Sequence, residues 1–379
     1  MPTPANPRTT FVSRGYRYEI FDIQVKHVNH DTLLLAWRQS LDSGRRTQVV
    51  MKPFPLTGRN TRRERALEEA KIATYLEHPN VAKVFGLASN DDEVYYVASE
   101  NVPGVYLATL LDYSLLMGQR LSPALAAYVA EMVADALAYV HGRESGGQLL
   151  HIVHRAVGPM CIRLGFEGLV KVTNFGTAFS TLRDRLATPP GELRGDAAYT
   201  APELWKAVMN SAGPRTDRII AGLIDGRADV FSLGLVLLEM LLGEYPLDPT
   251  DVPGTLNRQR VTAAIKTERP TWINPQVLAD RVLRFDVSEV DRRSEGMPEA
   301  LREIVRRALS TDPEMRFDAV EMRDRLRDYL CALERPFGRA ELSSEVKALC
   351  EGVRQIKGRW ATPIERTAFL KGEDGGASL

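Results

Sequence analysis

Residues 16–54 show a strand-like succession of apolar and polar positions, interrupted by turn-forming residues. Strands are predicted at Tyr18–Val28, Thr32–Arg38 and Thr47–Phe54. Residues 61–77 change to a helical period and end at a His-Pro-Asn stop. Two more strands, Ala82–Ala88 and Glu93–Ser99, follow this helix. The pattern predicts a small lobe of five strands and one helix.

Beyond the breaker run at 101–104 the chain becomes mainly helical. Residues 229–242 are apolar nearly all round, which predicts a buried central helix. Residues 243–298 are rich in proline and are expected to be irregular. Amphipathic helices are predicted at Leu107–Leu116, Ser122–His141, Glu299–Leu309 and Asp318–Leu333. The second lobe is therefore expected to be a helical bundle.

These patterns divide the chain into four parts. We expect a flexible arm at 1–15, a β-rich lobe at 16–102, a helical lobe at 103–334, and a C-terminal extension with one helix at 335–379. The helix of the extension carries an apolar stripe with 4-3-4-3 spacing, formed by Leu342, Val346, Leu349, Val353 and Ile356. Such a stripe either packs back on the large lobe or binds a partner protein.

Composition excludes several classes of function. The chain has 379 residues, of which 44% are hydrophobic and 26% charged, and its formal net charge is +0. A balanced charge gives no overall attraction to nucleic acid or anionic membrane, and no apolar run is long enough to span a bilayer. Cys161, Cys331 and Cys350 share no metal-ligand spacing, and the N-terminus has no signal-peptide pattern. We therefore expect reduced thiols in a cytoplasmic protein.

Residues 150–176 carry the most informative pattern in the chain. A loop at His154–Met160 precedes two β-rich runs around Glu167–Gly168, which predicts a hairpin. The hairpin ends at Asn174-Phe175-Gly176. The spacing resembles the catalytic loop and metal-binding turn of protein kinases, in which H-R-D-L-x-x-x-N is followed by D-F-G.

Other motifs follow in the order found in bacterial serine/threonine protein kinases. Val49-Val50-Met51-Lys52 resembles V-A-I-K, Ala201-Pro202-Glu203 matches A-P-E, and Asp312-Pro313-Glu314-Met315-Arg316 resembles the segment whose arginine pairs with that glutamate. The resemblance covers roughly residues 16–332. It implies an α+β, bilobal protein-kinase-like fold, with a β-rich N-lobe that includes helix αC, a helical C-lobe, and here a helical tail. The structural supports that it implies are His154, Phe175, Glu203, Asp229 and Arg316.

The reactive positions of the family motif carry other residues. The catalytic Asp, the Lys, the Asn and the metal-binding Asp are replaced by Ala156, Gly158, Cys161 and Asn174. Ala156 has no oxygen to orient an attacking hydroxyl, and Gly158 removes the cation that neutralises the transferring phosphoryl group. Asn174 offers one neutral oxygen and Cys161 a soft thiol, so neither suits Mg²⁺. The resemblance therefore implies no catalytic residue and no metal ligand.

The nucleotide-binding positions are altered as well. The three glycine positions of the family's phosphate loop fall on Lys26, Val28 and Asp31. Val50 replaces the alanine that packs on adenine, and Arg163 stands where the family has an apolar floor. We expect ATP and Mg²⁺ binding to be weak or absent, and no cofactor to be used.

Several residues have both a functional and a structural interpretation. Lys52 and Glu69 are either a vestigial nucleotide-binding pair or an ion pair that ties helix to sheet. Asn174 also suits a left-handed turn, and Cys161 a buried strand position. Arg155 either binds a phosphorylated activation segment or makes internal hydrogen bonds. A basic run at the first helix is either a partner- or phosphate-binding patch or a solvated face, and consists of Arg59, Arg62, Arg63 and Arg65.

Three functions follow as hypotheses. The first is a catalytically inactive kinase homologue (pseudokinase) in bacterial signalling, a scaffold or allosteric regulator whose cytoplasmic partner is a protein such as an active kinase or its substrate. The second is an unconventional ATP-dependent protein kinase or nucleotidyl transferase with a rearranged site, for which Glu167 and Asp184 are the nearby acids. The third is a phosphopeptide-binding sensor that uses Arg155 and the basic run. No oligomeric state follows from the sequence.

Overall fold

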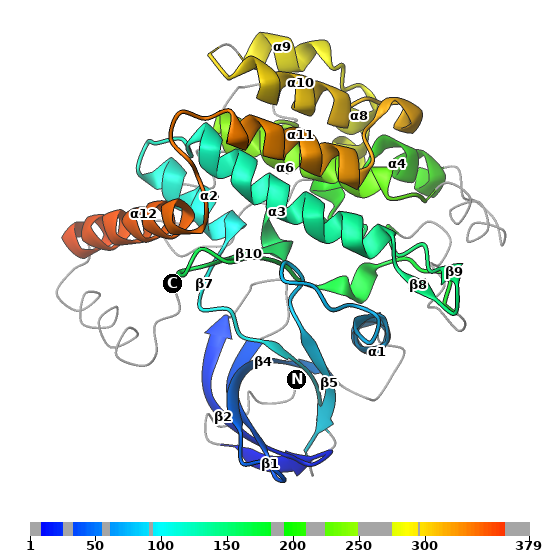
Figure 1. Ribbon diagram of the computed structural model, residues 1–379, viewed down its shortest axis with the longest axis vertical. Helices are drawn as coiled ribbons and strands as arrows, with labels where there is room; N and C mark the ends of the chain where they lie inside the picture. The colour runs from blue at the N-terminus through cyan, green and yellow to red at the C-terminus, as the bar shows by residue number, and fades with distance from the viewer. Residues whose placement is uncertain are drawn as a thin grey trace. The chain divides into compact units, whose positions relative to one another are not determined.

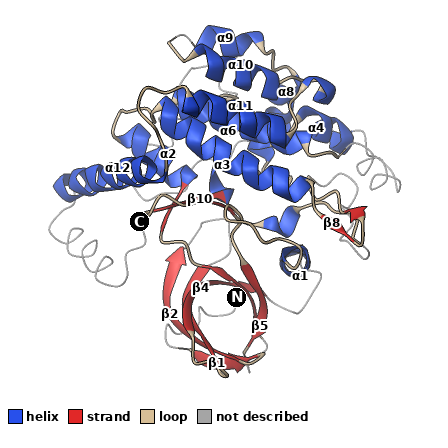
Figure 2. Ribbon diagram, in the orientation of Figure 1, coloured by secondary structure: helices blue, strands red, loops and turns tan. Residues whose placement is uncertain are grey.

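The structure, a computed structural model, describes residues 9–25, 33–54, 61–90, 94–182, 193–209, 224–248, 275–294 and 296–360. These residues fold into two compact units (Figure 1). The smaller unit contains the described residues up to Glu77, those of 82–103, and the last four described residues, 357–360. The larger unit contains His78–Val81 and the described residues from Gly104 to Ile356. The predicted α+β class is confirmed, since most strands belong to the smaller unit and most helices to the larger one (Figure 2).

The smaller unit is built on one antiparallel sheet of six strands, in the order β1-β2-β3-β4-β6-β5. Successive side chains of a strand point to opposite faces, so on β4 Val49 and Met51 are fully buried while Val50 between them is partly exposed. The elements are β1 (Thr10–Ser13), β2 (Tyr16–Val25), β3 (Leu33–Ser40), β4 (Arg46–Phe54), α1 (Thr61–Ala73), β5 (Val84–Ser89) and β6 (Tyr95–Glu100).

Strand β1 corrects the expectation of a flexible arm at 1–15. Residues Thr10–Ser13 pair with β2 in antiparallel register. The ring of Phe11 is 6% exposed and stacks on Tyr18 and Tyr96, with ring centroids 5.3 and 5.4 Å apart. The prolines and threonines of the segment suggested a loose arm, but one buried aromatic side chain anchors part of it to the sheet.

The larger unit is mainly helical and also contains two small sheets, β11-β10-β7 and β8-β9. Its strands are β7 (Gly104–Tyr106), β8 (Glu144–Ser145), β9 (Gln148–Leu149), β10 (Ile162–Gly165) and β11 (Val170–Val172). Its helices are α2 (Leu107–Leu116), α3 (Pro123–His141), α4 (Pro202–Met209), α6 (Arg227–Leu242), α8 (Pro275–Leu283), α9 (Ser288–Arg293), α10 (Glu299–Ala308), α11 (Ala319–Cys331) and, up to Ile356, α12 (Arg339–Trp360).

Helices α3 and α6 lie at the centre of the larger unit. Helix α3 begins at Ser122, whose Oγ accepts the amide of Leu125 at 3.1 Å, and Pro123 occupies its first turn. Helix α6 is buried along nearly its whole length, as its continuous apolar pattern predicts. Within the described helices, α3 is the one long and apolar enough to cross a membrane. It lies mostly buried against α11 and α6, which is typical of a core helix.

Three details of the predicted elements differ from the structure. The expectation of irregular structure at 243–298 is wrong for α8 and α9, whereas 249–274 lie outside the described residues. Helix α1 ends at Ala73 because the amide of Thr74 turns back to the carbonyl of Lys71, three residues earlier. The short hairpin β8–β9 was not predicted, although its turn consists of two glycines with positive φ, Gly146 and Gly147.

The C-terminal extension forms helix α12, whose apolar stripe faces the larger unit. Leu342, Val346 and Val353 are at most 1% exposed, and Leu349 is 9% exposed. Of the two alternatives for this stripe, packing on the chain's own large lobe is the one that the structure contains.

Candidate functional site

The candidate site is built on the hairpin of β10 and β11 in the larger unit. Ile162 pairs with Val172, and both side chains are buried, which fixes the register of the two strands. Cys161 directly precedes β10, and Asn174 lies two residues after β11. The amide of Thr173 donates to the carbonyl of Cys161 at 2.9 Å. The hairpin therefore brings together the two positions that correspond to the family's metal ligands.

The side chains of Asn174 and Cys161 face each other. Nδ2 of Asn174 donates a hydrogen bond to Sγ of Cys161 over 3.8 Å. Asn174 has a left-handed backbone, with φ 67° and ψ 59°, which asparagine tolerates better than most residues. Among the described residues, no group of three or more His, Cys, Asp or Glu could hold a metal ion. An amide and a thiol do not fit Mg²⁺, which prefers carboxylate oxygens.

Ala156 and Gly158 lie in the buried loop that precedes β10. A Cβ atom at Gly158 would lie 3.1 Å from Cδ2 of Tyr199, so a side chain at this position requires the tyrosine ring to shift by a few tenths of an ångström. The hydroxyl of Tyr199 donates to Oε2 of Glu239 at 2.5 Å, and its carbonyl accepts from Ser232 at 2.6 Å. Hydrogen bonds at the hydroxyl and at the carbonyl of Tyr199 therefore fix the ring that faces Gly158.

One carboxylate beside this loop was not predicted. Oδ2 of Asp196 lies 3.5 Å from the Cβ position of Gly158, while Oδ1 accepts the amide of Ala198 at 3.0 Å. Gly195 brings Asp196 close to the loop, because any Cβ on Gly195 would lie 2.0 Å from the carbonyl oxygen of Arg155. Gly195 shortly precedes the A-P-E motif, and it is the sequence signal from which a role of Asp196 at this loop could have been predicted.

Asp229 on α6 holds the loop by its backbone. Oδ2 accepts the amide of His154 and Oδ1 that of Arg155, both at 2.8 Å, and Nε2 of His141 lies 2.9 Å from Oδ2. Burial alone would raise the pKa of Asp229. The hydrogen bond and charge of His141, together with His154, nevertheless leave that pKa below its usual value. The carboxylate stabilises a loop in which Arg155 has a positive φ of 62°.

His154 packs inside the same loop. Its ring meets Phe175 edge-on, with centroids 4.6 Å apart. Nε2 donates to the carbonyl of Thr173 at 2.9 Å, and Nδ1 accepts the amide of Ala156 at 3.2 Å. Burial lowers the pKa of His154, because the charged imidazolium loses its hydration. His154 therefore connects the loop to the turn after β11.

The side chain of Arg155 is directed at the protein's own backbone. Nε donates to the carbonyl of Thr177 at 2.8 Å and Nη2 to that of Ala178 at 3.2 Å. Arg155 is 6% exposed, and its guanidinium carbon lies 5.9 Å from the centroid of the Phe179 ring. These contacts agree with the interpretation of Arg155 as a residue that makes internal hydrogen bonds. A phosphate could reach this guanidinium only by displacing them.

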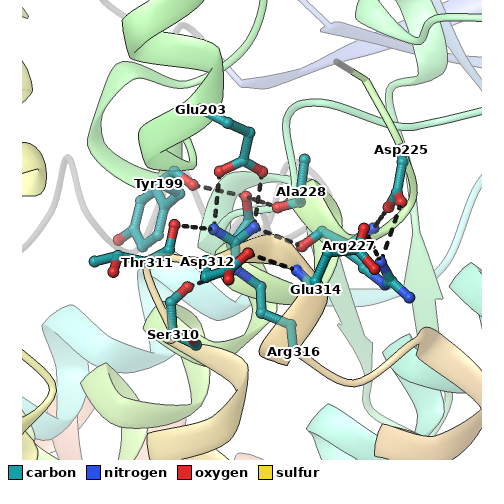
Figure 3. A network of polar contacts seen from close by, with 11 residues as sticks. Tyr199, Glu203, Asp225, Arg227, Ala228, Ser310, Thr311, Asp312, Glu314 and Arg316 are labelled. Atoms are coloured by element: carbon teal, nitrogen blue, oxygen red, sulfur yellow. Dashed lines mark hydrogen bonds and ion pairs between the residues drawn. The ribbon is translucent and has the colours of Figure 1, made fainter. Parts of the chain in front are cut away.

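Glu203 and Arg316 form the second polar support of the larger unit (Figure 3). Nη1 and Nη2 of Arg316 donate to the two carboxylate oxygens at 2.7 and 2.8 Å. Nε also donates to the carbonyl of Ser310 at 2.7 Å, and the guanidinium carbon lies 4.9 Å from the centroid of Phe231 on α6. The pair thus links the start of α4 to α6 and to the segment before α11.

Arg163 lies on β10 and is 8% exposed. It pairs with Tyr106 of β7, and its guanidinium carbon lies 4.8 Å from the centroid of that ring. Burial lowers the pKa of Arg163. A cation stacked on an aromatic ring thus occupies the position where the resemblance places an apolar floor.

Strand β4 and helix α1 carry the two residues of the predicted ion pair, Lys52 and Glu69. Lys52 is half-buried on β4 opposite Val97, and Glu69 on α1 is 7% exposed. Arg63 and Arg65 are half-buried on α1, and the ion pair and the basic patch stay predictions. Arg59, the side chain of Arg62, and the loop positions Lys26, Val28 and Asp31 lie outside the described residues.

Comparison with known proteins gives one consistent result. A model of the protein kinase domain matches residues 38–325. Similar proteins include serine/threonine-protein kinase PrkC of Bacillus subtilis, 26% identical over 277 residues, and tyrosine-protein kinase MasK of Myxococcus xanthus, 27% identical over 294 residues. A probable serine/threonine-protein kinase of Clostridium perfringens is 30% identical over 254 residues.

These three matches cover 73%, 76% and 67% of this chain but only 35%, 39% and 30% of the relatives. The chain therefore spans less than half the length of each of these proteins, and the similarity concerns one domain of them.

Proposed function

The chain belongs to the protein kinase family, and from the altered chemistry of its site we propose that it is a pseudokinase that binds another protein instead of transferring phosphate. In this proposal it acts as a scaffold or allosteric regulator of a cytoplasmic partner, such as an active kinase or its substrate. ATP and Mg²⁺ binding are weak or absent.

The contact between Asn174 and Cys161 carries this proposal. In a kinase these two positions hold oxygen ligands for the metal ions that neutralise the phosphates. Here the amide of Asn174 donates to the thiol of Cys161 at 3.8 Å, so the two side chains bond to each other. A hard divalent cation gains little from a neutral amide and a soft sulfur.

The loop before β10 supports the same conclusion. Ala156 has no group that could accept a proton, and Gly158 has no side chain and packs closely against the ring of Tyr199. Asp229 and the Glu203–Arg316 pair keep the scaffold around this loop in place. A fold that retains its supports without its reactive groups fits a role in binding.

The alternatives have weaker support. For an unconventional kinase or nucleotidyl transferase, a replacement acid is needed, but Glu167 lies in the β10–β11 turn with its carboxylate 3.7 Å from Arg339, and Asp184 lies outside the described residues. For a phosphopeptide sensor, Arg155 would have to give up its bonds to Thr177 and Ala178. The relatives carry the names of kinases, and those names describe proteins much longer than the matched domain.

The test is the melting temperature with millimolar ATP, in the presence and absence of Mg²⁺ or Mn²⁺. Ligands that bind the folded state raise the melting temperature by mass action. We expect no metal-dependent rise, whereas an active bacterial kinase measured in parallel should show one. Incubation with radiolabelled ATP and generic protein substrates should leave them unlabelled.

A Lys52→Met variant is the control for residual activity. A metal-dependent rise of several degrees, or labelling by the wild-type chain that disappears in Lys52→Met, would contradict the proposal. Labelling that persists equally in the variant would come from a contaminating kinase.

A further inference from the structure

The turn between β10 and β11 is covered by the N-terminal end of α12. Nε of Arg339 donates to the carbonyl of Glu167 at 2.7 Å, and Oγ of Ser343 donates to the carbonyl of Phe166 at 2.6 Å. Both contacts use backbone oxygens of the turn, so they depend on its conformation and not on its side chains. The helix thereby satisfies two acceptors that the hairpin itself leaves unpaired.

Gly168 shows how closely the turn and the helix fit. A Cβ atom at this position would lie 1.9 Å from the carbonyl oxygen of Arg339. Gly168 also has a φ of +77°, and its amide donates to the carbonyl of Gly165 at 2.8 Å. Glycine is thus required twice, once by the turn itself and once by the approach of α12.

The rest of α12 is held by buried apolar side chains and one polar contact. Leu342 and Val346 are fully buried, and Val353 is 1% exposed. Oγ of Ser122, the N-cap of α3, donates to the carboxylate of Glu345 at 2.9 Å. The helix is therefore anchored to α3 as well as to the hairpin turn.

The hairpin connects this anchored turn to the altered metal site. Cys161 and Asn174 stand at the other end of the same two strands, joined by the bond between the Thr173 amide and the Cys161 carbonyl at 2.9 Å. The ladder between them and the turn has only three residue pairs. A short, continuous set of backbone hydrogen bonds therefore joins the turn to the Cys161–Asn174 end.

We propose that α12 is a strap that fixes the β10–β11 hairpin, and that its release loosens the hairpin together with the Cys161–Asn174 end. This inference goes beyond the proposed function, because it concerns the coupling of the tail to the site and holds whether or not nucleotide binds.

The experiment compares Val346→Asp with Ala348→Asp in the full chain by amide hydrogen exchange. Val346 is a fully buried residue of α12, whereas Ala348 is exposed on the same helix. Both variants add the same charge, but only the first should displace the helix. In Val346→Asp, the amides of Gly165, Gly168 and Thr173, which donate within the hairpin, should exchange about tenfold faster or more than in wild type. In Ala348→Asp they should keep wild-type rates.

Two results would overturn the strap. One is fast exchange throughout α12 in Val346→Asp while the hairpin amides keep their wild-type rates. The other comes from Ser343→Ala, which removes a single hydrogen bond to the turn. This milder variant is used if Val346→Asp also exposes the amides of α3. The hairpin amides of Ser343→Ala should exchange about threefold to fivefold faster, and unchanged rates there contradict the proposal.

Discussion

Arg316 binds Glu203 through both terminal nitrogens of its guanidinium, at 2.7 and 2.8 Å, although the two residues stand 113 positions apart in the sequence. The arginine side chain has no exposed surface, and that of the glutamate is 12% exposed. A buried pair of this kind stabilises the fold only when it is complete, because either charge left alone has lost its hydration without compensation.

Removal of one partner of the Glu203–Arg316 pair should therefore lower the stability of the fold. Glu203→Ala leaves the buried guanidinium unpaired, and we expect the free energy of unfolding to decrease by about 3–5 kcal/mol. Urea denaturation measures this change. Arg306→Ala is the matched control, since Arg306 pairs with Glu303 and Asp291 at the surface and should cost less than about 1 kcal/mol. Equal losses in the two variants would contradict this assignment.

The pH dependence of stability should reflect His154. Burial lowers the pKa of His154, so the unfolded chain binds this proton more readily than the folded protein. The contribution of His154 to the free energy of unfolding is therefore fully present above the pKa of the unfolded chain, about 6.5. It is lost as the pH falls toward the lower pKa of the folded protein. Burial lowers the pKa of His78 as well, with the same sign.

The measurement is the urea midpoint between about pH 7.5 and 5.5, which should fall with pH. A His154→Gln variant should show a shallower fall, whatever its absolute stability. Burial raises the pKa of Glu131 and of Glu345, which acts in the opposite sense, so the comparison with His154→Gln isolates the contribution of the histidine. A midpoint that rises as the pH is lowered through this range would refute the prediction.

Strand β1 should contribute to the stability of the smaller unit through one side chain. Phe11 is buried between Tyr18 and Tyr96, so Phe11→Ala should lower the free energy of unfolding by about 3–5 kcal/mol. Val12 on the same strand is 54% exposed, and Val12→Ala should cost less than about 0.5 kcal/mol. If thermal unfolding monitored by tyrosine fluorescence gives the same small change for both variants, the strand is not an integral part of the sheet.

Local signals predicted much of this fold correctly. The Ser122-Pro123 start of α3 is visible in the sequence because a cap and a first-turn proline act over a few residues. The hairpin at 162–172 follows from two short β-rich runs around Gly168, whose φ of +77° only glycine adopts readily.

Features that depend on distant partners were not predictable in the same way. The sequence around Phe11 contains nothing to indicate that Tyr18 and Tyr96 enclose its ring. The apolar stripe of α12 was recognised from the sequence. Its docking, however, brings Arg339 of the helix against Gly168 of a turn that lies 171 residues earlier in the chain. At the candidate site, the sequence showed which residues replace the reactive groups of the family. The contact of Asn174 with Cys161 could not be predicted, because it depends on side-chain geometry.

Gly158 and Tyr199 provide a direct test of whether the catalytic loop can be rebuilt. A Cβ at Gly158 would lie 3.1 Å from the Tyr199 ring, and this ring is fixed by its bond to Glu239, so Gly158→Lys should destabilise the chain by about 1–3 kcal/mol and add no phosphoryl transfer. Urea denaturation and radiolabelled ATP measure the two effects. Gly338→Ala is the control, because its Cβ meets its nearest neighbour at an ordinary 3.6 Å and should change stability little. A Gly158→Lys protein as stable as wild type would mean that Tyr199 moves aside and that the position accepts the missing lysine.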